Sequence, residues 1–142
     1  MSAEELKATF NRAAGAAYNQ GDVDKLDEIY APEFVYHRPP FPDIVGLKAY
    51  KQLIVDVRQG FSDSRLTFDE IIVEGNTMTT RWTWQGKNTN QSPFLPFPPT
   101  GKEVKITGSS VSHLKGGKAT EEWNHVDWLG FFQQLGIIPP LG

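Results

Sequence analysis

The hydrophobic positions of this chain change their spacing about halfway along it. Before residue 61 they recur every three or four positions, which predicts amphipathic helices over residues 3–20, 23–30 and 47–60. Ser2 and Glu5 have the spacing of a capping box at the start of the first helix. Apolar stripes of this kind are typical of core packing, so we assign no chemistry to them.

From Arg65 onward apolar and polar residues alternate, which predicts strands. Gly75-Asn76 and Gly116-Gly117 are predicted hairpin turns. The alternation falls out of phase near Asp69-Glu70, which indicates a bulge that bends the sheet. The predicted strands cover residues 34–37, 65–73, 77–85, 103–115 and 118–127, and a short helix follows over 128–135.

Helices followed by long antiparallel strands indicate an α+β fold. We expect a curved antiparallel sheet wrapped around the N-terminal helices as a cone with an interior cavity. The sequence contains no internal repeat and no linker, so we predict one domain over residues 1–142.

The last predicted strand carries the strongest candidate chemistry. Because side chains alternate across a strand, Glu121, Trp123, His125 and Asp127 share one face. Two carboxylates, an imidazole and an indole make a poor core and a plausible pocket wall. If the Gly116-Gly117 turn has two residues, the small residues Ser112, Ser110 and Gly108 lie opposite the first three of them and leave room for a ligand.

Asp127 has two possible roles. It directly precedes the short helix, so its carboxylate is well placed to cap that helix. It is also the best candidate for a catalytic acid or base, and the two roles do not exclude each other.

The other candidate ligand contacts come from elsewhere in the chain. Trp82 and Trp84 share one face of their strand, and the proline-rich segment 92–101 is a predicted lid or rim over the same pocket. His37 lies at a strand end beside a proline loop, where a ligand contact competes with a structural role. Tyr18 lies near the end of the first helix, and its direction is left open.

Composition narrows the classes of function. The chain has no cysteine, which excludes disulfides and thiolate chemistry. A net charge of −3 without a long basic run argues against nucleic-acid binding. An acidic start and the lack of a long apolar run predict no signal peptide and no membrane span, so we expect a cytoplasmic protein. His37, His125 and Asp127 show no metal-ligand spacing, so no metal is predicted.

Several motifs together resemble the SnoaL-like polyketide cyclases, or ester cyclases, of the nuclear-transport-factor-2-like superfamily. The similarity covers nearly the whole chain in order. It is carried by Gly21-Asp22, Tyr30-Ala31-Pro32-Glu33-Phe34-Val35-Tyr36-His37, Glu74-Gly75-Asn76, Arg81-Trp82-Thr83, Pro98-Pro99-Thr100-Gly101-Lys102, Gly117-Lys118, Glu121-Glu122-Trp123, Asp127, Gly130 and Gln133-Gln134-Leu135-Gly136.

The resemblance implies a cone-shaped α+β barrel with a deep apolar pocket, no cofactor and a dimeric or higher assembly. It implies that Asp127 is the acid/base of an intramolecular aldol ring closure and that His37 lies near the pocket. The expected ligand is a small apolar or aromatic polycarbonyl compound. The exposed sheet face and the apolar tail 137–142 both need cover, which also predicts a homodimer.

Three alternatives remain open on the same scaffold. A ketosteroid-isomerase-like proton shuttle also needs only one aspartate. A limonene-epoxide-hydrolase-like site needs an Arg and an Asp two positions apart on the strand facing Asp127, where Trp82 and Trp84 stand instead. The third alternative is a non-catalytic binding protein.

Overall fold

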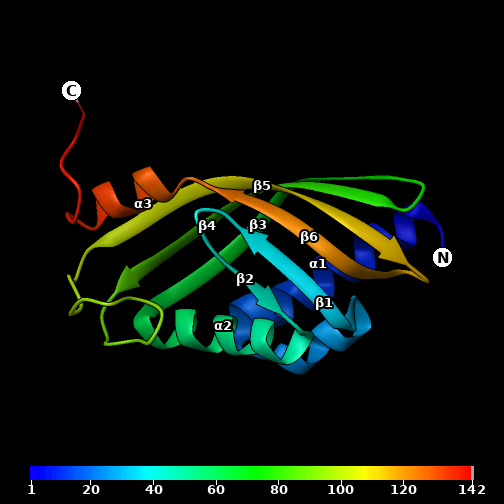
Figure 1. Cartoon of the computed structure of the whole chain (residues 1–142), viewed down its shortest axis with the longest axis horizontal. Helices are drawn as coiled ribbons and strands as arrows, with labels where there is room; N and C mark the ends of the chain where they lie inside the picture. Colours follow the sequence, from blue (N-terminus) through cyan, green and yellow to red (C-terminus); the bar gives the residue numbers. More distant parts are fainter. Residues whose placement is uncertain (142) are drawn as a thin grey trace.

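A curved sheet of six strands wraps over two long helices in the computed structural model, which describes residues 1–141 (Figure 1). Gly142, the last residue of the predicted tail, lies outside the described residues. The elements in chain order are α1 (Ala3–Gln20), a 3-10 helix (Val23–Glu28), β1 (Tyr30–Arg38), β2 (Phe41–Val45), α2 (Leu47–Gly60), β3 (Phe61–Glu74), β4 (Thr77–Asn88), β5 (Glu103–Lys115), β6 (Lys118–Val126) and α3 (Trp128–Gln134).

The strand order is β2-β1-β6-β5-β4-β3, and the sheet does not close on itself. All neighbouring strands are antiparallel except β1 and β6, which run parallel. The α+β class with a curved sheet is therefore confirmed, while the parallel pair was not predicted.

Helix α1 begins and ends where its local signals predict. The Ser2 hydroxyl accepts a hydrogen bond from the Glu5 amide at 3.1 Å, which confirms the N-cap. Gly21 ends the helix with φ at 78°, a conformation that glycine adopts without strain. The buried face of α1 is mostly alanine, so its backbone can approach the sheet closely.

The segment after β1 differs from the prediction. The sequence predicted a proline loop directly after His37, but β1 continues to Arg38 and Phe41 already begins the edge strand β2. An edge strand can contain Pro42, because one row of its backbone amides has no partner strand to bond.

Strands β3 and β4 pair as predicted. The register shifts between Phe68 and Glu70, which confirms the bulge, and Glu70 lies opposite Arg81. The bulge increases the local twist and bends the sheet over the helices.

Another bulge, which was not predicted, lies between β5 and β6. Next to the turn, Leu114 pairs with Ala119 as expected, but His113 then pairs with Glu121, so Thr120 is an extra residue on β6. A shift of one residue turns every following side chain to the other face. The predicted pocket face of β6 is therefore wrong, and Glu122 and Asn124 are directed inward instead.

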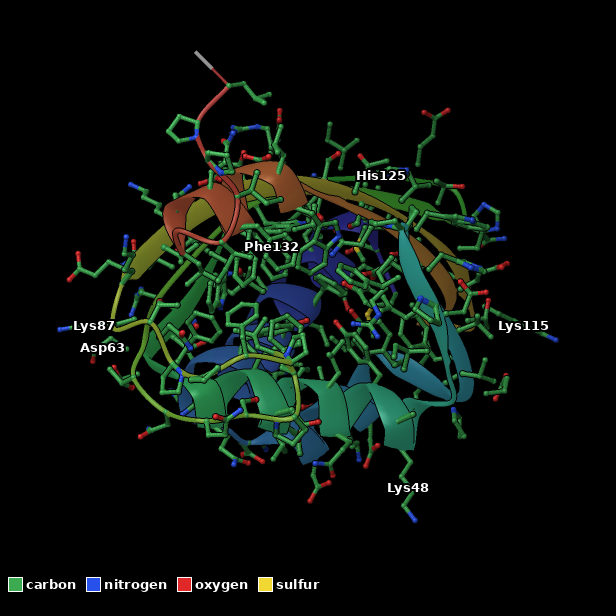
Figure 2. The ribbon with its side chains drawn as sticks, turned by 60° about the vertical axis from the view of Figure 1, so that its left-hand side comes forward. Lys48, Asp63, Lys87, Lys115, His125 and Phe132 are labelled. Carbon is green, nitrogen blue, oxygen red and sulfur yellow. The ribbon has the colours of Figure 1, made fainter. Side chains whose placement is uncertain are left out.

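Two apolar clusters fill the concave side of the sheet. One gathers residues of α1, α2 and β1 around Phe34 and Tyr50. The other lies near the far end of the sheet around Trp84 and Phe131. Figure 2 shows side chains filling the space between the sheet and α2. None of the described helices is long and apolar enough to cross a membrane.

Candidate active site

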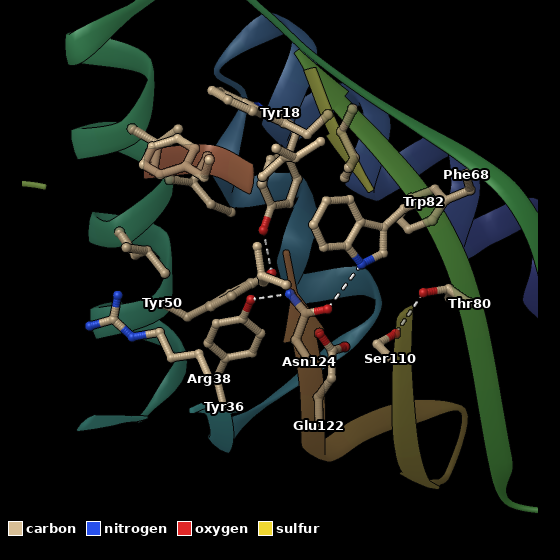
Figure 3. Close-up of a pocket in the computed structure, with 18 of the residues that line it drawn as sticks. Tyr18, Tyr36, Arg38, Tyr50, Phe68, Thr80, Trp82, Ser110, Glu122 and Asn124 are labelled. Carbon is tan, nitrogen blue, oxygen red and sulfur yellow. Dashed lines mark hydrogen bonds between the residues drawn. The ribbon is translucent and has the colours of Figure 1, made fainter. Parts of the chain in front are cut away.

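A cavity lies between the two apolar clusters, inside the curve of the sheet (Figure 3). Its volume is about 110 Å³, several times the space that one water molecule requires. All four tyrosines of the chain and three of its four tryptophans line this cavity, and most of the other lining residues are aliphatic or phenylalanine. Such a surface suits a flat, largely apolar ligand.

Glu122 is the only acidic side chain among the described lining residues. Its Oε1 accepts hydrogen bonds from the Ser112 hydroxyl at 2.9 Å and from the Tyr30 hydroxyl at 3.3 Å. Its side chain is buried, and loss of solvation raises its pKa to about 7, although both hydrogen bonds act in the opposite direction. Near neutral pH, Glu122 is therefore able both to accept and to return a proton.

A directed chain of hydrogen bonds runs beside this carboxyl group. The Trp82 indole N–H donates to Asn124 Oδ1 at 2.9 Å, and Asn124 Nδ2 donates to the Tyr36 hydroxyl oxygen at 2.6 Å. Figure 3 shows these three side chains in line across the cavity. Because Tyr36 accepts in this chain, its own hydroxyl hydrogen is left to donate to a ligand oxygen.

The remaining tyrosines extend the polar surface. The Tyr18 and Tyr50 hydroxyl groups are 2.6 Å apart. Burial raises the pKa of both tyrosines, and also of Tyr30 and Tyr36, above the ordinary value. All four therefore remain neutral hydroxyl groups in the cavity at physiological pH.

Gly108 lies directly beneath Trp82. These residues pair across β4 and β5, and a Cβ atom at position 108 would overlap the Trp82 ring and the His125 carbonyl oxygen. The absence of a side chain lets the indole lie flat on the sheet with its N–H directed to Asn124.

Of the predicted ligand contacts, Tyr18, Trp82 and Trp84 lie in the cavity wall. The predicted cap over residues 92–101 contributes Phe94 to that wall. We predicted one continuous pocket that also included Trp123 and His125, and neither lines it.

Four predicted contact residues lie instead on the outer side of the sheet. Glu121, Trp123 and His125 are displaced to that side by the Thr120 bulge, and Figure 2 shows His125 there. His37 Nε2 lies 2.6 Å from a Glu121 oxygen, and its ring stacks on Trp123. The hydrogen bond to Glu121 raises the pKa of His37. His37, Glu121 and Trp123 therefore form a surface cluster. The predicted place of Glu121, Trp123 and His125 in the pocket wall is wrong, and His37 has the structural role that its sequence position left open.

Asp127 is exposed and lies outside the cavity lining, although Val126 and Trp128 on either side of it belong to that lining. Its Oδ1 accepts a hydrogen bond from the Gly130 amide at 2.9 Å, which confirms its role as N-cap of α3. Its predicted position on the pocket wall is therefore wrong, and its catalytic role stays a prediction.

Four residues of the cavity wall were not predicted from the sequence: Glu122, Asn124, Tyr36 and Arg38. One signal for Tyr36 was present, because Phe34 and Tyr36 alternate with polar residues and so share the inward face of β1. No comparable signal marked Glu122 or Asn124, because the bulge that turns them inward falls at an ordinary threonine. Within residues 1–141 no three His, Asp or Glu side chains come together as metal ligands.

An open, curved sheet with an aromatic cavity and one buried carboxyl group defines a small α+β protein with a site for an organic ligand. The family model for SnoaL-like polyketide cyclase matches residues 8–135, and the chain belongs to this family.

Several solved structures share the fold of this chain. TsrD from Streptomyces laurentii is 26% identical with a TM-score of 0.79, and the match covers 95% of each chain. A protein from Acidithiobacillus ferrooxidans, provisionally described as a polyketide cyclase, is 26% identical with a TM-score of 0.78 over 96% of this chain and 98% of that one. AclR from Streptomyces galilaeus, at 21% identity, shares the fold with a TM-score of 0.79 over 99% of this chain and 87% of that chain. No functionally curated protein matches the sequence significantly.

Proposed function

We propose that this protein is a cofactor-independent cyclase that closes a carbon ring by an intramolecular aldol reaction. The observation that carries the proposal is Glu122, a buried carboxyl group with a pKa of about 7 in an aromatic cavity. Membership of the SnoaL-like polyketide cyclase family supports this class of reaction. The proposed substrate is a small aromatic or apolar polycarbonyl compound.

The reaction needs one group that first accepts and then returns a proton. Ionised Glu122 removes a proton from a carbon next to a carbonyl group, and the electron pair of that C–H bond forms an enolate. The enolate carbon attacks a second carbonyl carbon of the same molecule, which forms the new C–C bond and an alkoxide. Protonated Glu122 then gives its proton to the alkoxide, so the enzyme is restored and the product is an isomer of the substrate.

Two further features of the cavity assist this sequence. The free hydroxyl hydrogen of Tyr36 is placed to donate to the enolate or alkoxide oxygen, where negative charge develops. Aromatic walls hold a flexible chain folded so that its reacting carbons meet, which lowers the entropic part of the barrier.

Asp127 is the competing candidate for the base, because the family resemblance implies that role. Its exposure and its hydrogen bond to Gly130 favour capping, while burial and a raised pKa favour Glu122 as the base. A limonene-epoxide-hydrolase-like site is disfavoured, because the positions that would carry its Arg and Asp are Trp82 and Trp84.

The deciding experiment measures proton removal by three matched carboxyl variants. β-Tetralone, a neutral bicyclic ketone, is incubated with the protein in D₂O, and loss of its α-hydrogens is followed by NMR. We expect Glu122→Gln to lower the enzymatic exchange rate by about a hundredfold or more, because it removes the proton-transfer group but retains the shape. Glu121→Gln on the outer face and Asp127→Asn at the cap should stay close to the wild-type rate, since Asn caps a helix nearly as well as Asp.

Ring closure is then measured with an aryl diketone that can form a six-membered ring, whose aldol product is recognised by its new C–C bond. Exchange at the wild-type rate in Glu122→Gln would show that Glu122 is not the base. If exchange were lost only in Asp127→Asn, Asp127 would be the base instead. Exchange without ring closure would favour the second candidate, a ketosteroid-isomerase-like proton shuttle, for which a single buried carboxyl group with hydroxyl donors also suffices. No acceleration of either reaction would favour a non-catalytic binding protein.

A further inference from the structure

One cation lines the cavity. Arg38, the last residue of β1, is the only basic side chain among the described lining residues. Its Nε donates to the Pro42 carbonyl at 3.2 Å, and its Cζ lies 5.6 Å from the centre of the Phe41 ring. It makes no salt bridge with any of residues 1–141. Its two terminal amino groups, with four N–H donors, therefore have no protein carboxylate to bind.

The surroundings of Arg38 do little to stabilise its charge. Burial lowers the pKa of Arg38, because partial loss of water disfavours the cation. The guanidinium nevertheless stays charged at physiological pH. An anion on the ligand would restore the lost stabilisation through short, charge-assisted hydrogen bonds.

A second unused donor lies near the same end of the cavity. The indole N–H of Trp128 is buried and has no hydrogen-bond partner among the described residues. The Trp128 ring lines the cavity and packs edge-on against the Phe41 ring, with 4.8 Å between the ring centres. Arg38 contacts the same Phe41 ring. A buried donor without a partner is rare in native proteins, and a ligand oxygen would satisfy it.

The position of Glu122 indicates where a negative group on the ligand can bind. In Figure 3 the Arg38 guanidinium and the Glu122 carboxyl group lie on opposite sides of Tyr36. A second negative charge beside Glu122 would raise its pKa further and oppose its ionisation. An anionic ligand is therefore oriented with its charge at Arg38 and its neutral carbonyl groups toward Glu122.

We propose that the substrate is a free carboxylic acid whose carboxylate is bound by Arg38, with Trp128 as a second donor at that end. This inference rests on the proposed function only in taking the cavity as the substrate site. It narrows the substrate class from polycarbonyl compounds in general to polycarbonyl acids.

The experiment compares two probes of the same size and different charge. Binding of naphthoic acid, ionised at neutral pH, and of neutral naphthamide is measured by titration calorimetry on the intact protein. We expect the wild type to bind naphthoate at least about tenfold more tightly than naphthamide. Arg38→Gln should bring the two affinities together, and Arg38→Lys, which keeps the charge without the planar fork, should retain part of the preference.

Arg81→Gln is the matched control, because Arg81 is exposed on the outer face and the substitution changes net charge by the same amount. Its preference for naphthoate should equal that of the wild type. The proposal is overturned if the wild type binds naphthoate and naphthamide equally or binds neither. It is also overturned if the preference for naphthoate survives Arg38→Gln, or if Arg81→Gln loses that preference to the same extent as Arg38→Gln. Since binding requires no turnover, a failure here is distinct from a failure of Glu122 in the exchange experiment.

Discussion

At the scale of single residues, the chemistry depends on where each carboxyl group lies. Glu121 and Glu122 are neighbours in the sequence, yet one bonds His37 on the outer side of the sheet and the other is buried in the cavity. The raised pKa of Glu122 follows from that burial and not from its residue type. Alternation along the predicted strand favoured Glu121, and only the folded chain shows that Glu122 is the buried one.

The raised pKa of Glu122 predicts a specific dependence of stability on pH. Its pKa rises from 4.5 to about 7 on folding, so the native state binds the proton more tightly than the unfolded state. The protonated Glu122 therefore contributes to the free energy of unfolding. This contribution is fully present below pH 4.5 and is lost as pH rises to about 7, which lowers the free energy of unfolding by an amount on the order of 3 kcal/mol. Glu122→Gln should remove this slope from the free energy of unfolding, measured by denaturant titration at several pH values.

Glu103→Gln, which changes an exposed carboxyl group at the start of β5, is the control and should keep the wild-type slope. The prediction fails if the wild type and Glu122→Gln show the same change in unfolding free energy across this pH range.

At the scale of elements, the cavity depends on how β4, β5 and β6 pair. The register of β4 on β5 places Trp82 over Gly108, and the bulge at Thr120 then directs Asn124 toward the Trp82 indole. The hairpins and one bulge were predictable from turn residues and alternation. The bulge at Thr120 was not, because nothing in the residues 119–121 distinguishes a bulged strand from a regular one.

Gly108→Ala tests this arrangement. The added methyl group would collide with the Trp82 ring and the backbone of β6, so we expect a loss of about 1–3 kcal/mol in unfolding free energy, the usual effect of overpacking. Displacing Trp82 would also disturb the Asn124 amide, so naphthamide binding should weaken.

Gly15→Ala in α1 serves as the control, because its nearest contact is the Asn19 amide at 3.9 Å. It should leave binding unchanged and keep or slightly increase stability, since alanine favours helix over glycine. Equal stability of Gly108→Ala and the wild type would show that the sheet adjusts freely at this position.

At the scale of the whole molecule, the outer face of the sheet carries exposed apolar side chains to which no function has been assigned. Ile72 and Val111 are exposed there by 53% and 39%, and both lie in one row across the sheet that reaches the partly buried Trp123. Exposed apolar side chains on a broad face are typical of a contact surface. We continue to predict a homodimer through this face.

Val111→Glu should therefore convert the dimer to a monomer, because it places a charge on the apolar face that we predict to be the contact. The measurement is sedimentation velocity at micromolar concentration. Val55→Glu is the control, because Val55 is similarly exposed, at 41%, but lies on α2. A monomeric wild type, or a dimer that survives Val111→Glu, would contradict the prediction.

The sequence by itself determined the elements whose signals are local. The Ser2 cap, the helical stripe of α1, the Gly75-Asn76 hairpin and the shared face of Trp82 and Trp84 each depend on residues close together in the chain. The tertiary structure alone decided which face of β6 meets the cavity and that β1 lies parallel to β6. Both features depend on pairing between residues that are far apart in the sequence. On β6 the single extra residue Thr120, which no sequence signal identifies, turns every side chain after it to the other face of the sheet. The acid–base character of Glu122 was decided at the same level, because desolvation exists only once the chain has folded around it.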